Sequence, residues 1–290
     1  MLRYQGLEVV YYDFTLKCLA YGSLRLMQSP GMKIEKICIQ QLERGNEMIF
    51  TANKGQTSYG EAIGILLLDT ETPFILGDVG NAKSYDYPVR FKTVEGLLTD
   101  RIFAHDYSFI KGMIAGAQEL EREGVKAITG DCGFMAIFNE EVKEAVSIPV
   151  FLSSLLQIPF IQSTLPAGAK IGVLTANSDS LTPEVFNKIG LNDVAGLVIR
   201  GLQHEKHFKD AVVDEIGTLD SDGIRAEVLQ AAKEITSDHP EIRSLLLECS
   251  MMPPYSVAVQ QATGLPVYDF LTMIDYVYTA VVKKHFADTI

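Results

Sequence analysis

The segment AIGILLL, residues 62–68, decides the class of fold. An uninterrupted apolar run of this length is typical of a strand buried on both faces, as in parallel sheets covered by helices. Similar short runs follow at Val125–Gly130 and Ile148–Leu152, and the segments between them, Asp106–Glu123 and Phe134–Val146, are predicted to be helical. Strands and helices therefore alternate, which predicts an α/β fold.

The second half of the chain repeats this alternation. Its predicted strands are Lys170–Leu174, Val194–Ile199, Ser244–Leu247 and Pro266–Tyr268. Its predicted helices begin at Thr182-Pro183-Glu184 and cover about Ile224–Ile235, Pro254–Ala262 and Phe270–Lys284. We expect mainly parallel sheets with helices on both faces.

The two halves share a frame that indicates an internal duplication. Cys132 and Cys249 are each followed 17 residues later by Pro-Val, and each comes directly after an apolar strand and one acidic residue. IGIL at residues 63–66 and IGVL at 171–174 open the two halves 108 residues apart, against 117 for the cysteines. Loop-length variation accounts for the difference. Each half is thus predicted to carry one cysteine at the carboxyl end of a strand.

Composition excludes several classes of protein. With 290 residues, 47% of them apolar, the chain is long enough for two domains and a large core. A net charge of -12 argues against a nonspecific nucleic-acid or anionic-membrane surface. The first sixty residues carry a net +2 and the remainder -14, so residues 1–60 are predicted to be a separate N-terminal extension of unknown role. Its apolar runs, Leu7–Tyr12 and Ile34–Ile39, are candidate strands or arms that pack on a partner subunit.

The four cysteines are too few for a disulfide scaffold and show no CxxC spacing for zinc. The chain starts without a secretory signal pattern, and no run approaches the length of a membrane span. We therefore expect a cytoplasmic protein with free thiols, no metal site and no membrane partner. Cys18 and Cys38 lie outside the repeat and are predicted to be structural.

Cys132 and Cys249 are predicted to carry chemistry. In open α/β sheets, ligands bind outside the carboxyl ends of the strands. A cysteine between a strand and the start of a helix lies at that edge, where the helix dipole can lower the thiol pKa. A lone cysteine after a strand is more often a small buried apolar residue. Two at equivalent places in a duplicated frame favour a pair of acid–base groups facing one ligand from opposite sides.

The sequence resembles the aspartate/glutamate/hydantoin racemase superfamily. The elements that carry the resemblance are IGILLLDT (63–70), ITGDCGFM (128–135), IGVLTANS (171–178) and LLLECSMMPPY (245–255). The resemblance implies two pseudo-symmetric α/β domains, residues 61–158 plus 270–290 and residues 159–269, with the active site in the cleft between them. It also implies that Cys132 and Cys249 are catalytic and that no cofactor is needed. The substrate-binding residues that it implies are Thr70, Asn81, Gly133, Phe134, Thr175, Asn177, Ser178, Ser250 and Met251.

The chain departs from this family at both cysteines. Amino-acid racemases of the family commonly have Cys-Asn-Thr at the first and Cys-Thr at the second, where this chain has Cys132-Gly133-Phe134 and Cys249-Ser250-Met251. The resemblance thus implies a racemase or epimerase of an amino acid or related small-molecule carboxylate, working as a possible homodimer. A bulkier or less polar substrate than aspartate fits these replacements.

Two alternatives stay open at this point. The first is another enzyme on the same scaffold, such as a maleate isomerase or a decarboxylase, in which the cysteines would act asymmetrically. The second is a non-catalytic carboxylate-binding protein.

Overall fold

The computed structural model describes residues 3–4, 7–8, 51–52 and 54–284. The chain divides into two units, Met1–Thr51 and Ala52–Ile290. In the first unit, β1 (Arg3–Tyr4) and β2 (Leu7–Glu8) pair antiparallel. The rest of the predicted run that starts at Leu7, the run Ile34–Ile39, and Cys18 and Cys38 lie outside the described residues.

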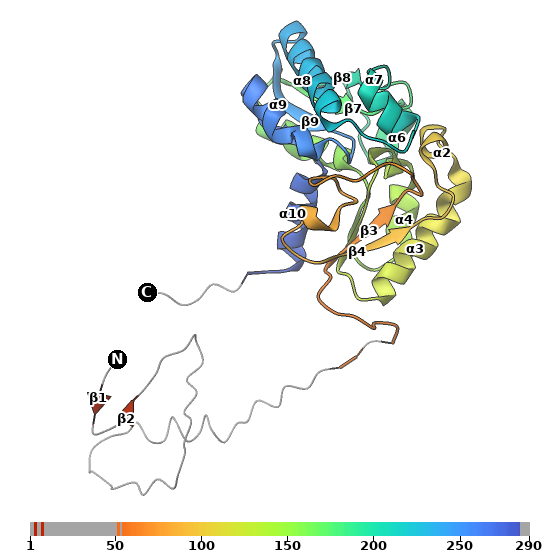
Figure 1. Ribbon diagram of the computed structural model, residues 1–290, viewed down its shortest axis with the longest axis vertical. Helices are drawn as coiled ribbons and strands as arrows, with labels where there is room; N and C mark the ends of the chain where they lie inside the picture. The colour runs from red at the N-terminus through yellow and green to blue at the C-terminus, as the bar shows by residue number, and fades with distance from the viewer. Residues whose placement is uncertain (1–2, 5–6, 9–50, 53, 285–290) are drawn as a thin grey trace, which may run out of the picture. The chain divides into compact units, whose positions relative to one another are not determined.

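The first half of the larger unit contains a parallel sheet of four strands in the order β4-β3-β5-β6 (Figure 1). The strands are β3 (Ile63–Leu67), β4 (Val89–Thr93), β5 (Ala127–Gly130) and β6 (Val150–Phe151). The central strand β3 is almost entirely buried, as its apolar run predicts. Strand β4 was not predicted, because VRFKT alternates apolar and charged residues in the half-buried pattern of an edge strand.

The second half contains a second parallel sheet with the order β8-β7-β9-β10. Its strands are β7 (Lys170–Thr175), β8 (Leu197–Gly201), β9 (Ile242–Leu247) and β10 (Val267–Tyr268). The first strand of each half is central and the second forms an edge, so the two sheets have the same topology. The duplicated α/β fold that the sequence predicts is confirmed.

Helices flank the two sheets (Figure 1). They are α2 (Thr99–Phe103), α3 (Ile110–Arg122), α4 (Asn139–Ala145), α5 (Ile158–Thr164), α6 (Pro183–Lys188), α7 (Lys206–Phe208), α8 (Ser221–Asp238), α9 (Ser256–Thr263) and α10 (Phe270–Val281). The segment after Cys132 begins directly as the 3₁₀ helix η3 (Gly133–Phe138). Cys249 is followed by a turn and then by the 3₁₀ helix η6 (Pro253–Tyr255). Neither segment begins as α-helix. Thr182 precedes α6 as predicted, but its side chain makes no capping hydrogen bond.

One glycine in each central strand lets a neighbouring side chain approach the backbone. A Cβ added at Gly64 would lie 3.0 Å from Leu120 Cδ1, and one added at Gly172 would lie 2.7 Å from Leu245 Cδ2. The shared IG(I/V)L pattern therefore reflects the same close packing in both halves.

The last helix returns to the first half. Phe270 and Ile274 of α10 are fully buried and pack in one cluster with Ile63 and Ile65 of β3. Helix α10 therefore packs with the first sheet, and residues 285–290 lie outside the described residues. None of the helices described is long and apolar enough to cross a membrane.

Candidate active site

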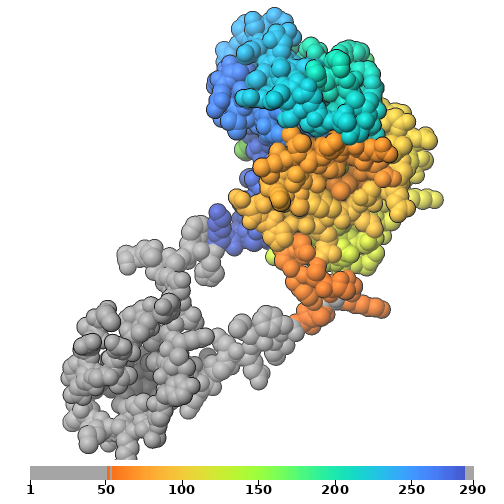
Figure 2. Space-filling model, viewed as in Figure 1, coloured from red at the N-terminus to blue at the C-terminus, as the bar shows by residue number. Residues whose placement is uncertain are grey.

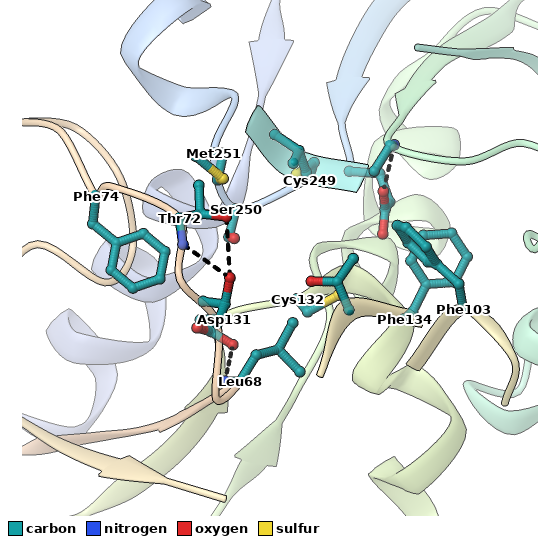
Figure 3. Close-up of a pocket in the computed structure, with 15 residues that line it drawn as sticks. Leu68, Thr72, Phe74, Phe103, Asp131, Cys132, Phe134, Cys249, Ser250 and Met251 are labelled. Carbon is teal, nitrogen blue, oxygen red and sulfur yellow. Dashed lines mark hydrogen bonds between the residues drawn. The ribbon is translucent and has the colours of Figure 1, made fainter. Parts of the chain in front are cut away.

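A pocket lies between the two halves, at the carboxyl ends of both sheets (Figure 3). Cys132 enters it from the first half and Cys249 from the second, as the duplicated frame predicts. The cavity has a volume of about 30 Å³, which is room for about one water molecule. Its lining residues are Leu68, Thr70, Thr72, Phe74, Thr99, Phe103, Asp131, Cys132, Phe134, Ala176, Val212, Glu248, Cys249, Ser250 and Met251.

The two cysteines have matching local structure. Each follows the last residue of a strand by two positions, after Gly130 of β5 or Leu247 of β9. The Cys132 carbonyl accepts the N–H of the third residue onward at 3.0 Å, and the Cys249 carbonyl does the same at 3.1 Å. Both thiols are free, with Cys249 buried and Cys132 partly exposed. The strand-to-turn geometry thus aims one thiol from each sheet at the same space.

The residue before each cysteine is a buried carboxylate. Asp131 accepts the N–H of Leu68 at 3.0 Å, and Glu248 accepts the N–H of Ala176 at 3.3 Å and the hydroxyl of Thr175 at 2.9 Å. Leu68 and Ala176 hold equivalent positions, 108 residues apart, just after the central strand of each half. Burial raises the pKa of both carboxyl groups to about 7, although these hydrogen bonds oppose the change.

The thiol pKa values are raised by their environment, whereas the sequence predicts that the helix dipole would lower them. Burial raises the pKa of both thiols well above its ordinary value, and the charge of Glu248 raises it further. The backbone N–H groups of Phe134 and Met251 act in the predicted direction on Cys132 and Cys249, respectively, but are outweighed. The 3₁₀ helix after Cys132 and the turn after Cys249 offer too little positive potential to offset desolvation and a neighbouring carboxylate.

Gly133 makes room for Glu248. A Cβ added at Gly133 would lie 1.8 Å from Glu248 Oε1, so any side chain there would displace the carboxylate. Glycine at position 133 therefore leaves the space that the acid from the opposite half occupies.

The structure divides the predicted substrate-binding residues into two groups. Those that line the pocket are Thr70, Phe134, Ser250 and Met251. Those that do not are Asn81, Gly133, Thr175, Asn177 and Ser178.

Most residues of the second group bind other protein groups. Thr175 donates to Glu248, while Asn177 accepts the N–H groups of Asp179 and Ser180. The hydroxyl of Ser178 accepts from the side chain of Gln203, and Asn81 caps the 3₁₀ turn Ala82–Ser84.

Hydrogen bonds join the two halves beside the pocket. Glu215 accepts the hydroxyl of Thr70 and, at 2.5 Å, that of Thr99. Thr72 donates to the carbonyl of Ala211 at 2.9 Å. Glu215 has a φ of +49°, a conformation that costs a residue with a side chain about 1 kcal/mol or more. Figure 2 shows the two halves in contact along the face drawn there.

Sequence reasoning did not assign three buried acids near this pocket. Besides Asp131 and Glu248, Asp78 is fully buried, and its Oδ2 has no hydrogen-bond partner among the described residues. The acid before each cysteine was visible in the duplicated frame. The sequence did not show that these acids are buried, because burial of a carboxylate depends on which residues of the other half pack against it.

The fold defines a class of two-lobed α/β proteins with a pocket between the lobes. A sulfate-associated mutant of arylmalonate decarboxylase aligns with 78% of this chain and 96% of its own at a TM-score of 0.53 and 16% identity, a likeness of fold alone. A glutamate racemase isoform from Bacillus anthracis aligns with 77% of this chain and 85% of its own at a TM-score of 0.48 and 14% identity. No protein-family model matches the chain.

Sequence comparison places the chain more narrowly. It is 35% identical over 222 residues to dimethylsulfoniopropionate lyase from Durusdinium sp. clade D, which covers 74% of this chain and 73% of that protein. It is 34% identical to dimethylsulfoniopropionate lyase 3 from Emiliania huxleyi strain CCMP1516, over 73% of this chain and 57% of the relative. The chain belongs to the dimethylsulfoniopropionate lyase family.

Proposed function

We propose that this protein is a lyase that cleaves dimethylsulfoniopropionate, or a carboxylate with a similar sulfonium group on its β carbon. The observation that carries the proposal is the pocket itself, in which one thiol from each half meets two buried carboxylates. The named activity of the relatives supports it. So does the lack of any Lys, Arg or His among the described lining residues, because such a pocket suits a ligand that carries a positive charge.

The reaction is an elimination. A thiolate, from Cys132 or Cys249, removes a proton from the carbon next to the substrate carboxylate. The carbon–sulfur bond on the β carbon breaks, its electron pair leaves with dimethyl sulfide, and a carbon–carbon double bond forms to give acrylate. The departing sulfide is neutral and needs no proton, so the reaction requires one base and uses the two cysteines asymmetrically.

The substrate has to help form the thiolate. Burial and Glu248 hold both thiols in the neutral form, and a cation in the pocket would lower their pKa by the reverse of the same electrostatic effect. We assign the substrate carboxylate to the hydroxyl side of the pocket, where Ser250 and Thr70 lie.

A two-base racemase or epimerase is the second candidate. The equivalent placement of Cys132 and Cys249 favours it, because inversion needs one acid–base group on each face of the carbon. It requires a substrate with a stereocentre next to the carboxylate, which dimethylsulfoniopropionate lacks.

One experiment separates the two candidates. Wild type, Cys132→Ser and Cys249→Ser are incubated in D₂O with dimethylsulfoniopropionate and, separately, with a panel of chiral amino acids. Dimethyl sulfide in the headspace and acrylate in the NMR spectrum, both lost in at least one variant, are expected. Racemisation with deuterium uptake, and no sulfide release, would favour the second candidate. Sulfide release retained in full by both variants would refute the role of the thiols.

A further inference from the structure

Only one of the two carboxylate oxygens of Glu248 accepts hydrogen bonds from described residues. Its Oε2 is held by Thr175 and Ala176, whereas Oε1 is buried and has no hydrogen-bond partner among the described residues. The side chain is fully buried and lines the pocket. An unpartnered buried carboxylate oxygen is costly, so its retention indicates a partner that arrives with the ligand.

Asp131 faces the same pocket from the other half. The Leu68 N–H donates to Asp131 Oδ1, and Asp131 is 4% exposed. The charges that raise the thiol pKa values come from acids: Glu248 and Asp131 act on both thiols, and Asp78 acts on Cys249. Asp131 also acts on Asp78 and on the Tyr85 hydroxyl. Each of these groups is either neutral or negative, so none of them can neutralise the two carboxylates.

The apolar part of the lining also suits a cation. Phe74, Phe103 and Phe134 line the pocket, and the rings of Phe103 and Phe134 pack edge to face with centroids 5.1 Å apart. In Figure 3, Phe103 and Phe134 lie on one side of the two thiols, and Phe74 lies on the other side, beyond Thr72 and Ser250. Aromatic faces attract onium groups, whose charge is spread over methyl groups and poorly hydrated.

We infer that Glu248 and Asp131 form the subsite for the positive group of the substrate and thereby select carboxylates with a β cation over uncharged ones. This inference rests on the proposed function for the identity of the reacting group. It assigns specificity to the two acids and leaves proton removal to the thiols. Gly133 contributes to this subsite, because the absence of a side chain there leaves room for the Glu248 carboxylate from the other half.

The test uses two unreactive ligands of the same shape. 3-(Trimethylammonio)propanoate carries a positive charge where 4,4-dimethylpentanoate has a carbon atom, and neither has a sulfide to lose. Their dissociation constants are measured by calorimetry on the full chain at pH 8, for wild type, Glu248→Gln, Asp131→Asn and the control Glu144→Gln. Glu144 is exposed on α4 and does not line the pocket.

Wild type and Glu144→Gln are expected to bind the cation at least about tenfold more tightly than its neutral isostere, and each pocket variant to lose most of that preference. The wild-type preference should also fall between pH 8 and pH 6, as protons compete with the cation for the carboxylates. Glu248→Gln keeps acceptors for Thr175 and Ala176, so a merely structural role would change the affinity for both ligands equally.

Three outcomes would overturn the inference: equal affinity of wild type for the two ligands, no binding of the cation up to 10 mM, or a full preference in both pocket variants. Failure of the proposed function would look different. In that case no dimethyl sulfide would form, but wild type would still prefer the cation to its neutral isostere.

Discussion

Replacing Glu248 by glutamine should change the stability of the protein by an amount that depends on pH. Burial raises the pKa of this carboxyl from 4.5 to about 7. Folding therefore favours the protonated form, and the stability that this adds is fully present below the unfolded value and lost as pH rises through 7. At about 1.4 kcal/mol per pH unit, the loss amounts to about 3 kcal/mol.

The variant is free of this loss, and below pH 5 its neutral amide accepts the hydrogen bonds from Thr175 and Ala176 much as the protonated carboxyl does. Glu248→Gln should thus be about as stable as wild type below pH 5 and about 3 kcal/mol more stable above pH 8. Urea unfolding at pH 5 and pH 8 measures both differences, and Glu144→Gln should match wild type at each. Asp131 and Asp78 titrate in both proteins, so they cancel in the comparison. A difference between variant and wild type that stays constant from pH 5 to pH 8 would refute the reasoning.

Three further predictions concern the same pocket. Gly133→Ala should destabilise wild type by about 2 kcal/mol or more but cost much less in a Glu248→Ala background, and urea unfolding of the four proteins gives the coupling energy; additive effects would contradict the contact. At pH 8 and 9, iodoacetamide should alkylate Cys132 and Cys249 slowly in wild type and several-fold faster in Glu248→Gln, because removal of that charge lowers the pKa of both thiols; equal rates by mass spectrometry would count against it. Glu215→Ala removes two hydrogen bonds that join the halves beside the pocket, so hydrogen exchange of residues 209–216 should become faster. Unchanged exchange would show that other contacts hold this segment in place.

Most of the fold could be predicted from the sequence because the main strands of each half have clear local patterns. The apolar runs of β3 and β7 are long enough to indicate buried parallel strands, and the shared cysteine frame showed that the two halves are equivalent. The weaker elements escaped prediction. Strand β4 alternates apolar and charged residues, and α2 and α5 are short segments whose helical form depends on packing against the rest of the domain.

The candidate site was predicted in part. Cys132 and Cys249 meet in one pocket because carboxyl ends of equivalent strands face each other when the halves pack together. Thr175 and Asn177 carry the polar groups that a carboxylate site needs, but both are hydrogen-bonded within the protein. Thr175 donates to Glu248, and Asn177 accepts the N–H of Asp179 in its own loop. Which polar groups are left free for a ligand is set by contacts between distant segments, and a local motif does not reveal it.

The sequence by itself determined a duplicated α/β protein with one cysteine at an equivalent strand end in each half. Only the tertiary structure decided the electrostatic character of the pocket. Asp131 and Glu248 are ordinary acids in the sequence. They become the dominant charges of the site because the packing of the two halves removes them from water and brings no described basic side chain into the lining. Burial is a property of the whole assembly of strands and helices, and so are the pKa changes that follow from it.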